Sequence, residues 1–406
     1  MRRSDLVLAV YLPTALLAMG QGLLLATLPF YATELGASLT MISVITAAAA
    51  IGTLIADVPV GMVLHRIGLR RAMLMGSALV VIGTMSLALP LEPAAVVALR
   101  VLAGVGTAMW GLSRHAFITQ ATDSANRGRS IAVFGGINRI GVFAGPAIGG
   151  IVATAASTSA SFLLAGAMGL LAFIAAVLFI PRDTSTAGST SHSRHVRWEL
   201  VRATLRENGG DLTAAGVAQL FAQMIRQGRQ LLIPLVGATV LDLNAAQVGL
   251  IMTASAVLDM TMFIPAGFLM DRFGRKFAAV PSFAIMAIGI GMVPFAGGFE
   301  GLLIAGLVIG FGNGLGSGTM MTLGADLAPP GATGEFLGLW RLIGDTGMVL
   351  GPLAVGLFAT WFGLNGSAIV LMIAGFLSSA ILFFLVKETR VVPVAQSPGP
   401  VSKAGA

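Results

Sequence analysis

Ionised side chains occur inside stretches of this sequence that are otherwise apolar. Eight residues lie in such stretches: Asp57, Arg100, Arg139, Arg226, Arg229, Asp259, Arg341 and Asp345. A charged side chain that faces lipid at the centre of a bilayer costs at least about 2.5–3.5 kcal/mol. Each is therefore expected to face a partner or a water-filled cavity, either in a fixed ion pair between helices or in the binding of a solute or a proton. Both interpretations stay open for each residue.

Amide side chains in the same stretches add candidate hydrogen bonds to a polar solute: Gln21, Asn138, Gln223, Gln227 and Asn313. A single amide of this kind more often joins two helices, and that interpretation also stays open. The sequence contains no cysteine, its four histidines are scattered, and no triad or paired-carboxylate spacing occurs. We therefore expect no metal site, no cofactor and no enzymatic activity.

The segments that carry these residues are long enough to cross a membrane. Hydrophobic residues make up 56% of the chain and charged residues 10%, against about 25% charged residues in soluble domains. A helix of roughly 20 apolar residues spans a hydrocarbon core of about 30 Å. Twelve segments have this character: 6–31, 40–64, 71–90, 93–113, 128–153, 159–181, 210–238, 246–270, 277–297, 301–325, 334–361 and 365–386. The sequence predicts an all-α integral membrane protein with twelve transmembrane helices in the lipid bilayer.

The two halves of the sequence repeat each other at a constant offset of 206 residues. Residues that recur at this offset include Gln21 with Gln227, Pro59 with Pro265, Arg66 with Arg272, Gly68 with Gly274, and Gly145-Pro146 with Gly351-Pro352. We expect two pseudo-symmetric six-helix bundles, over 1–181 and 210–387, joined by a cytoplasmic linker over 182–209 and followed by a tail over 388–406. Because six helices separate the copies, both bundles have the same orientation, and a site between parallel halves suits alternating access.

Basic residues predict the orientation of the helices. With the N-terminus in the cytoplasm, every Lys and Arg outside the predicted helices falls in a cytoplasmic loop or tail, whereas the outer loops hold only Glu34, Glu92, Asp242 and Glu300. This asymmetry follows the positive-inside rule. It predicts a multi-pass protein of the cell (cytoplasmic) membrane with both termini in the cytoplasm. It also accounts for the net charge of +7 without a nucleic-acid partner.

Three motifs carry a resemblance to a known family. The loop after 246–270 reads Gly267-Phe-Leu-Met-Asp271-Arg272-Phe-Gly274-Arg275-Lys276, which is similar to the GxxxDRxGRK signature of the major facilitator superfamily. Segment 128–153 contains Gly141-Val-Phe-Ala-Gly145-Pro146-Ala-Ile-Gly149-Gly150, which resembles the GxxxGPxxGG motif of its antiporters. Arg100-Val-Leu-Ala-Gly104-Val-Gly106 resembles the RxxxGxG motif of the same group. The chain thus resembles the twelve-helix drug:proton antiporters of this superfamily.

The resemblance implies that two of these motifs act as conformational gates. Charge at the Asp-Arg turn can pair across the halves or cap a helix end, and Gly145-Pro146 allows a bend. The expected gating residues are Asp57, Gly61, His65, Arg66, Gly68, Gly141, Gly145 and Pro146 in the first half, and Gly267, Asp271, Arg272, Gly274 and Arg275 in the second. In the first copy His65 and Leu69 replace an Asp and an Arg, which leaves the latch of the N-terminal half open.

Matched depths predict two ion pairs between the halves. Arg139 and Asp259 lie equally deep in segments that pack together in the superfamily fold, and Asp57 matches Arg341 nearer the cytoplasm.

The charges that remain are Arg100, Arg226, Arg229 and Asp345. Their positive excess favours an anionic or strongly polar solute. We expect Asp345 to carry a proton, because it has no evident dedicated partner, whereas an acid held against an arginine stays ionised. A fixed salt bridge to Arg341 is the alternative interpretation.

The resemblance implies a secondary transporter that moves a small organic solute by alternating access. The motif in 128–153 favours proton-coupled antiport, and therefore efflux. An uptake symporter or uniporter for a sugar or organic acid is the alternative within transport, and a membrane receptor or scaffold that transports nothing is a further one. The expected partners are a small-molecule substrate, protons and the lipid bilayer, and the protein is expected to be a monomer.

Overall fold

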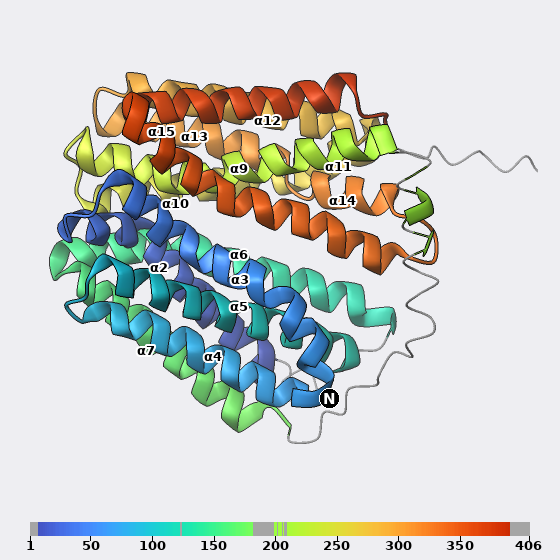
Figure 1. The fold of residues 1–406 in the computed structure, drawn as a ribbon, viewed down its shortest axis with the longest axis horizontal. Helices are drawn as coiled ribbons and strands as arrows, with labels where there is room; N and C mark the ends of the chain where they lie inside the picture. Colours follow the sequence, from blue (N-terminus) through green and yellow to red (C-terminus); the bar gives the residue numbers. More distant parts are fainter. Residues whose placement is uncertain are drawn as a thin grey trace, which may run out of the picture.

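All the regular elements that the structure describes are helices. The computed structural model describes residues 7–121, 124–181, 199–200, 202–204, 206 and 209–389. Figure 1 shows the helices of the first half, in blue to green, lying beside those of the second half, in yellow to red. The prediction of an all-α membrane protein built from two bundles is confirmed.

The N-terminal bundle contains six spans. They are η1 (Val7–Tyr11) continuing into α2 (Leu12–Glu34), α3 (Leu39–Ile67), α4 (Leu69–Met85) with η2 (Ser86–Ala88), α5 (Pro93–Ala121), α6 (Ser124–Ala155) and α7 (Thr158–Phe179). We call the end of the molecule at which α7 ends the linker end, because the next bundle begins there.

The C-terminal bundle repeats this order with more interruptions. Its elements are α9 (Gly209–Thr239), α10 (Ala245–Thr261) followed by α11 (Phe263–Phe273), α12 (Arg275–Met292) with η3 (Val293–Phe295), α13 (Phe299–Leu315) followed by α14 (Thr319–Leu327), and α15 (Thr333–Phe384). Gly363, with φ of 69°, interrupts α15 and divides it into two spans.

One of the twelve predicted spans is less apolar than the others. Ten helices in the described ranges are long and apolar enough to cross a membrane, and the division of α15 adds an eleventh span. The twelfth is α9, which carries two arginines and a series of glutamines and therefore falls outside the apolar set. Twelve spans agree with the predicted number, and the polar span α9 also lines the cavity between the bundles.

Two segments predicted as single helices are broken. The segment 246–270 is interrupted at Met262, and 301–325 is interrupted at 316–318, where Gly318 has φ of 77°. The breaks lie together, because a Cβ at Gly314 would overlap the backbone carbonyl of Asp259. Their equivalents in the first half, α3 and α5, are continuous. Glycine removes side-chain bulk and permits the left-handed backbone, which explains the break in the glycine-rich segment.

Packing within the bundles follows the sequence repeat. Helix α2 packs on α6 and α7 as α9 packs on the two parts of α15, and α3 packs on α5 as α10 packs on α13. A Cβ at Gly145 would overlap the backbone at Gly22, and the equivalent Gly351 abuts the backbone of Met224 and Gly228. The repeated glycines are therefore sites of close helix–helix approach, as is common in membranes.

The two bundles meet through α6 with α10 and through α3 with α15. A Cβ at Gly150 would overlap the Ala245 carbonyl, and one at Gly356 would meet Ser43 and the Leu39 carbonyl. These two contacts are equivalent at the offset of 206 residues, and both lie at the end opposite the linker. The molecule is therefore closed at that end by symmetric contacts of small residues.

Pro146 takes part in the contact between the bundles. It has no N–H to donate within α6, and Thr253 of α10 compensates. The Thr253 hydroxyl accepts a hydrogen bond from the Ala147 N–H at 3.1 Å and donates one to the Phe143 carbonyl at 3.0 Å. The backbone of α6 around Pro146 thus forms hydrogen bonds with α10 of the other half.

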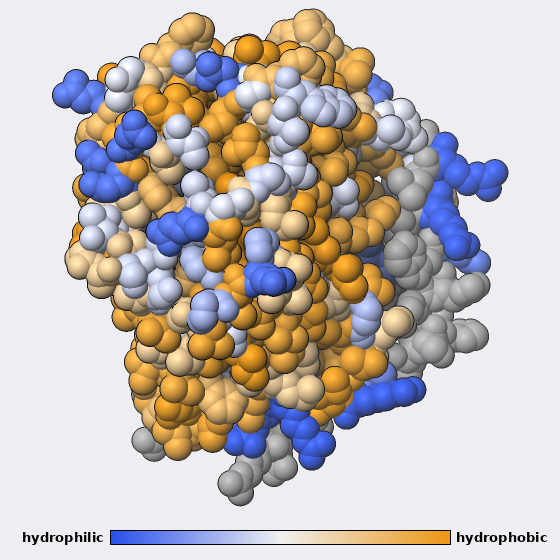
Figure 2. All heavy atoms as spheres, turned by 60° about the vertical axis from the view of Figure 1, so that its left-hand side comes forward, coloured by the Kyte–Doolittle hydropathy of each residue, from blue (hydrophilic) through white to orange (hydrophobic). Residues whose placement is uncertain are grey.

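The outer surface carries many large apolar side chains. Leu178, Ile264, Phe295 and Trp361 are each more than 60% exposed, and Figure 2 shows hydrophobic residues over most of the visible face. Apolar exposure on this scale requires a non-aqueous surrounding, which fits a surface in contact with lipid tails.

Adding a single carbon at Gly150 tests the closed end. Overpacking a tight contact costs about 1–3 kcal/mol, so Gly150→Ala should shift the conformational equilibrium by about 5–150-fold toward opening at the end opposite the linker. The chain contains no cysteine, so one cysteine introduced at Gln227, near the middle of α9, can report the change. We expect faster labelling by an impermeant thiol reagent applied from that end.

Gly338→Ala is the matched control, because nothing lies within 4 Å of the added carbon. It should leave the labelling rate unchanged. If Gly150→Ala also leaves the rate unchanged, this contact does not close the molecule.

Candidate functional site

A cavity of about 230 Å³, which we call the central cavity, lies between the bundles. Its walls come from α2, α3 and α5 of the first half and from α9 and α15 of the second. The polar residues in these walls include three of the predicted site residues, together with others that sequence reasoning missed: Gln21, Arg100 and Gln227, then Thr53, Thr107 and Gln230. The repeat offset contained a signal for two of them, because Thr53 and Thr107 are the equivalents of Asp259 and Asn313.

A second cavity of about 210 Å³ adjoins the first toward the linker end, and we call it the vestibule. Gln21, Thr53 and Thr107 line both cavities. The vestibule is also lined by the predicted residues Asn138 and Arg341. Since the Arg341 side chain is 53% exposed, the path from the central cavity reaches the surface at the linker end.

The vestibule also contains two charged or titratable residues that sequence reasoning placed outside the helices. The predicted fourth span ended at residue 113, because Arg114 and His115 follow it. Helix α5 instead continues to Ala121, and both side chains line the vestibule. Arg114 is 9% exposed. It is therefore a further buried cation beyond the eight charges that the sequence indicated.

Arg100 is an arginine of the central cavity whose charge is not neutralised by the protein. Its Nε atom is sealed from solvent and has no hydrogen-bond partner. No residue that the structure describes forms an ion pair or a ring contact with it. The guanidinium can therefore pair with a group that enters the cavity.

The other buried arginines near the midpoint surround one carboxylate. Asn313 Nδ2 donates a hydrogen bond to Asp259 Oδ2 at 2.7 Å, and Asp259 is only 2% exposed. Asp259 is also the negative charge that acts on Arg139, Arg226 and Arg229. We call these five residues the Asp259 cluster.

The backbone breaks supply acceptors for the Asp259 cluster. Arg226 Nη2 donates to the carbonyl of Gly316, at the break after α13, at 2.9 Å, and its Nη1 contacts Gln223 Oε1 at 3.4 Å. Arg229 Nη1 lies 3.5 Å from the Ser255 hydroxyl. The Gly316 carbonyl, which lies where the helix is interrupted, thus accepts a hydrogen bond that a second carboxylate could otherwise accept.

The predicted ion pair between Arg139 and Asp259 is not formed in this conformation. Arg139 Nη1 donates instead to the Ser317 hydroxyl at 2.9 Å, and the guanidinium lies 3.9 Å above the centre of the Phe263 ring. The reason is the two helix breaks, which were not predicted. Ser317 lies in the second break and Phe263 begins the helix after the first, and both contact Arg139.

The predicted pair of Asp57 and Arg341 is formed across the halves. Arg341 Nη2 lies 3.4 Å from Asp57 Oδ2, and Arg341 Nε lies 3.4 Å from Asp345 Oδ2. Asp345 therefore has a partner, as in the alternative interpretation of the sequence. Two carboxylates share one guanidinium, and Asp57 Oδ1 is buried without a hydrogen-bond partner. We call these three residues the Arg341 triad.

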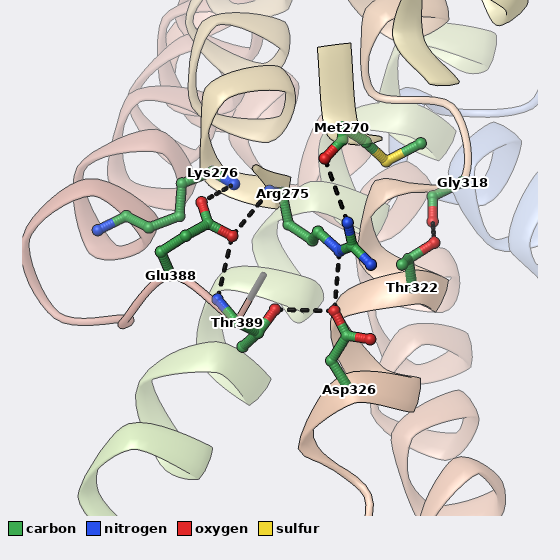
Figure 3. Close-up of polar contacts among 8 residues, drawn as sticks. All are labelled: Met270, Arg275, Lys276, Gly318, Thr322, Asp326, Glu388 and Thr389. Atoms are coloured by element: carbon green, nitrogen blue, oxygen red, sulfur yellow. Dashed lines mark hydrogen bonds and ion pairs between the residues drawn. The ribbon is translucent and has the colours of Figure 1, made fainter. Parts of the chain in front are cut away.

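The signature motif of the second half forms a polar network at the linker end (Figure 3). Arg275 Nε pairs with Asp326 Oδ2 at 2.8 Å, and Arg275 Nη1 donates to the Met270 carbonyl at 3.1 Å. The Glu388 carboxylate accepts the backbone N–H groups of Arg275 at 2.8 Å and Lys276 at 3.0 Å. Because the first N–H groups of a helix have no internal partners, Glu388 caps α12 from beyond the last span.

The neighbouring gating residues lie elsewhere. Asp271 is exposed and forms no ion pair with the residues that the structure describes. Arg272 lies 5.7 Å from the rings of Phe268 and Phe273. Gly274 has φ of 115°, a backbone conformation that favours glycine. The network therefore centres on Arg275 rather than on the Asp-Arg pair of the motif.

The first-half copy of the motif retains only part of this arrangement. Arg70 donates to the Val177 carbonyl at 3.0 Å, and its equivalent Lys276 donates to the Phe383 carbonyl at 2.7 Å. Leu69, however, is fully buried where the second half has Arg275. The other expected gating residues of this copy, Gly61, His65 and Arg66, are exposed, and Gly68 has φ of 85°.

Comparisons with known proteins agree with this architecture. The family model described as "Major Facilitator Superfamily" matches residues 10–222 and 215–405. The chain is 27% identical to the hexuronate transporter of Bacillus subtilis over 158 residues, which is 39% of this chain and 37% of that protein. It is 26% identical to the quinolone resistance protein NorA of Staphylococcus aureus over 184 residues, 45% of this chain and 47% of NorA. The chain thus matches less than half the length of these two relatives.

A solved structure matches over nearly the whole chain. The crystal structure of a D-xylose-proton symporter aligns with a TM-score of 0.76 at 16% sequence identity, covering 96% of this chain and 99% of that one. At this identity the likeness concerns the fold alone.

Removing the carboxylate of the Asp259 cluster should be costly. Asp259→Asn leaves three arginines without their negative partner, and removal of one member of a buried ion pair costs about 3–5 kcal/mol. Arg139→Gln should lower the free energy of unfolding by less, because it removes one positive charge from a cluster in which positive charges are in excess. The thermal unfolding midpoint of the purified protein measures both effects.

A double variant distinguishes the effect of the lost charge at Asp259 from the effect of altered packing. Asp259→Asn combined with Arg229→Gln should regain part of the loss, because the positive excess falls again. An Asp259→Asn protein as stable as the parent would show that the cluster does not depend on this carboxylate.

Proposed function

The chain belongs to the major facilitator superfamily, and from this premise we propose that it exports a small organic solute in exchange for protons by alternating access. The observation that carries the proposal is the cavity between two bundles that is sealed at one end and continues to the surface at the other. A secondary transporter needs such a path to open alternately at its two ends.

The direction of this path follows from the basic residues. The positive-inside pattern places the linker end in the cytoplasm, so the conformation described above would face inward. The symmetric contacts of Gly150 and Gly356 then form the outer gate, and the Arg341 triad lies at the inner mouth. Rocking of one bundle against the other would open the outer gate and close the inner mouth.

The Arg341 triad supplies a site for proton coupling. One guanidinium cannot fully neutralise two carboxylates, so one of them is able to take a proton. Asp57 belongs to the first half and the other two residues to the second, so rocking changes the distance between them. A proton drives transport only if its affinity differs between the two conformations, and this geometry provides such a difference.

Export is supported by the motif in α6 and by the likeness to NorA, which is named as a quinolone resistance protein. Uptake is the second candidate. It is favoured by the likeness to a hexuronate transporter and by the central cavity, which at about 230 Å³ is smaller than the about 300–1,000 Å³ of sites for drug-sized ligands.

Flux in proteoliposomes distinguishes export from uptake. Vesicles containing the purified full chain are loaded with norfloxacin, glucuronate or D-xylose, and a pH step is then imposed. We expect a transported probe to move against the proton flow. Movement with the protons would instead establish symport, and no flux above that of protein-free vesicles for any probe would contradict the proposal.

Coupling through the Arg341 triad predicts a specific defect. Asp345→Asn and Asp57→Asn should abolish accumulation driven by a pH step while retaining exchange of labelled for unlabelled solute, because exchange requires no net proton movement. Glu300→Gln, an exposed acid at the start of α13, is the control and should behave as the parent. Unchanged pH-driven accumulation in both Asp variants would assign the proton to another group.

A further inference from the structure

We propose that the transported solute carries a carboxylate, and that Arg100 binds this group in the central cavity. The inference rests on the transport function proposed above and names the class of substrate. Sequence reasoning had attributed an anion preference mainly to the excess of arginine, without locating it. The structure assigns it to one side chain.

The arginines of the membrane interior differ in what neutralises them. Arg139, Arg226 and Arg229 share Asp259 and each contacts an acceptor oxygen of the protein. Arg341 contacts two carboxylates. Arg100 has no hydrogen bond, ion pair or ring contact with the part of the chain that the structure describes, and its Nε atom is buried without a partner. It also lines the cavity, where a ligand can reach it.

Packing gives no reason for a charge at this position. The repeat equivalent of Arg100 in the second half is Gly306, which packs closely against Ile251. The fold therefore accommodates a residue without a side chain here. Arg100 lines the cavity and no described group of the protein compensates its charge, so a ligand that brings a negative charge would supply the missing partner.

The guanidinium limits what that partner can be. Its planar N–H groups match the two oxygens of a carboxylate, and such bidentate pairs are stronger and more specific than single hydrogen bonds between neutral groups. A neutral ligand would leave the charge uncompensated, and a cationic ligand would be repelled.

The remaining walls indicate the body of the ligand. Thr53 and Thr107 donate their hydroxyl hydrogens to backbone carbonyls within α3 and α5, so they present acceptor lone pairs to the cavity. Gln227 and Gln230 add amide groups, while Leu24 and Leu28 supply apolar surface. A cavity of about 230 Å³ fits a small solute of mixed polarity with one carboxylate.

Matched pairs of compounds test the charge alone. Benzoate, nicotinate and glucuronate are compared with benzamide, nicotinamide and glucuronamide, using the shift in thermal midpoint of the purified full chain and counterflow in proteoliposomes. We expect at least one acid to bind at least about tenfold more tightly than its neutral twin. Arg100→Gln should abolish this preference, and Arg100→Lys should retain part of it.

The ligand-free protein provides a second readout. If Arg100 is unpaired until the ligand binds, Arg100→Met should raise the thermal midpoint of the empty protein while removing acid binding. A lower midpoint would mean that Arg100 stabilises the fold, which overturns the proposal. Arg229→Gln is the comparison variant: it should leave the ratio of acid to amide binding unchanged, whatever its effect on the total.

The outcomes separate this inference from the transport function. Binding of neutral compounds as tight as that of the acids, or no preference for any acid over its neutral twin, overturns the carboxylate proposal. Counterflow of a neutral solute would at the same time leave the transport function intact. Retained acid preference in Arg100→Gln with lost pH-driven flux would place Arg100 in proton transfer and overturn its role as the ligand's partner.

Discussion

The organisation of this protein depends on the cost of placing charge in a medium that cannot solvate it. Positive side chains outnumber negative ones in the interior, and the helices group them in two clusters. Asp259 acts on three arginines, whereas Arg341 is shared by two acids. The first cluster has two carboxylates fewer than arginines, and the second has one carboxylate more. Arg100 stands outside both, and it faces the cavity.

Small residues allow these clusters to move relative to one another. Glycines within each bundle bring the backbone of α2 close to that of α6, and the backbone of α9 close to that of α15. The contacts between the halves are of two kinds. At the end opposite the linker, small residues and backbone meet, with hydroxyl hydrogen bonds and no ion pair among the described residues. Toward the linker end, the described contacts include the ion pair of Asp57 with Arg341. The first kind can close tightly, because it requires no charge to be desolvated. When the linker end opens, the charged groups of this ion pair can be hydrated by water, or the carboxylate can bind a proton.

The fold was predictable because the membrane restricts it so strongly. Apolar segments of sufficient length, the offset of 206 residues and the distribution of basic residues together predict two six-helix bundles. The pair of Asp57 and Arg341 followed from depth alone, because both helices are continuous to that level. The same reasoning failed for Arg139, since the unpredicted breaks after Thr261 and Leu315 bring Phe263 and Ser317 into contact with it. It also failed for Arg114, because a basic residue was taken as the end of a span that in fact continues.

The two halves share a backbone plan but divide the chemistry. In the first half, the positions equivalent to Asp259 and Asn313 hold Thr53 and Thr107, whose hydroxyls line both cavities. In the second half, Asn313 donates a hydrogen bond to Asp259, and the nearby Arg226 donates to the Gly316 carbonyl at the break after α13. The second half therefore contains arginines that hydrogen-bond to acceptor oxygens of the protein and share one carboxylate, while the first half presents hydroxyls and an arginine without a protein partner to the central cavity. The two halves thus differ in which of them leaves polar groups available to a ligand.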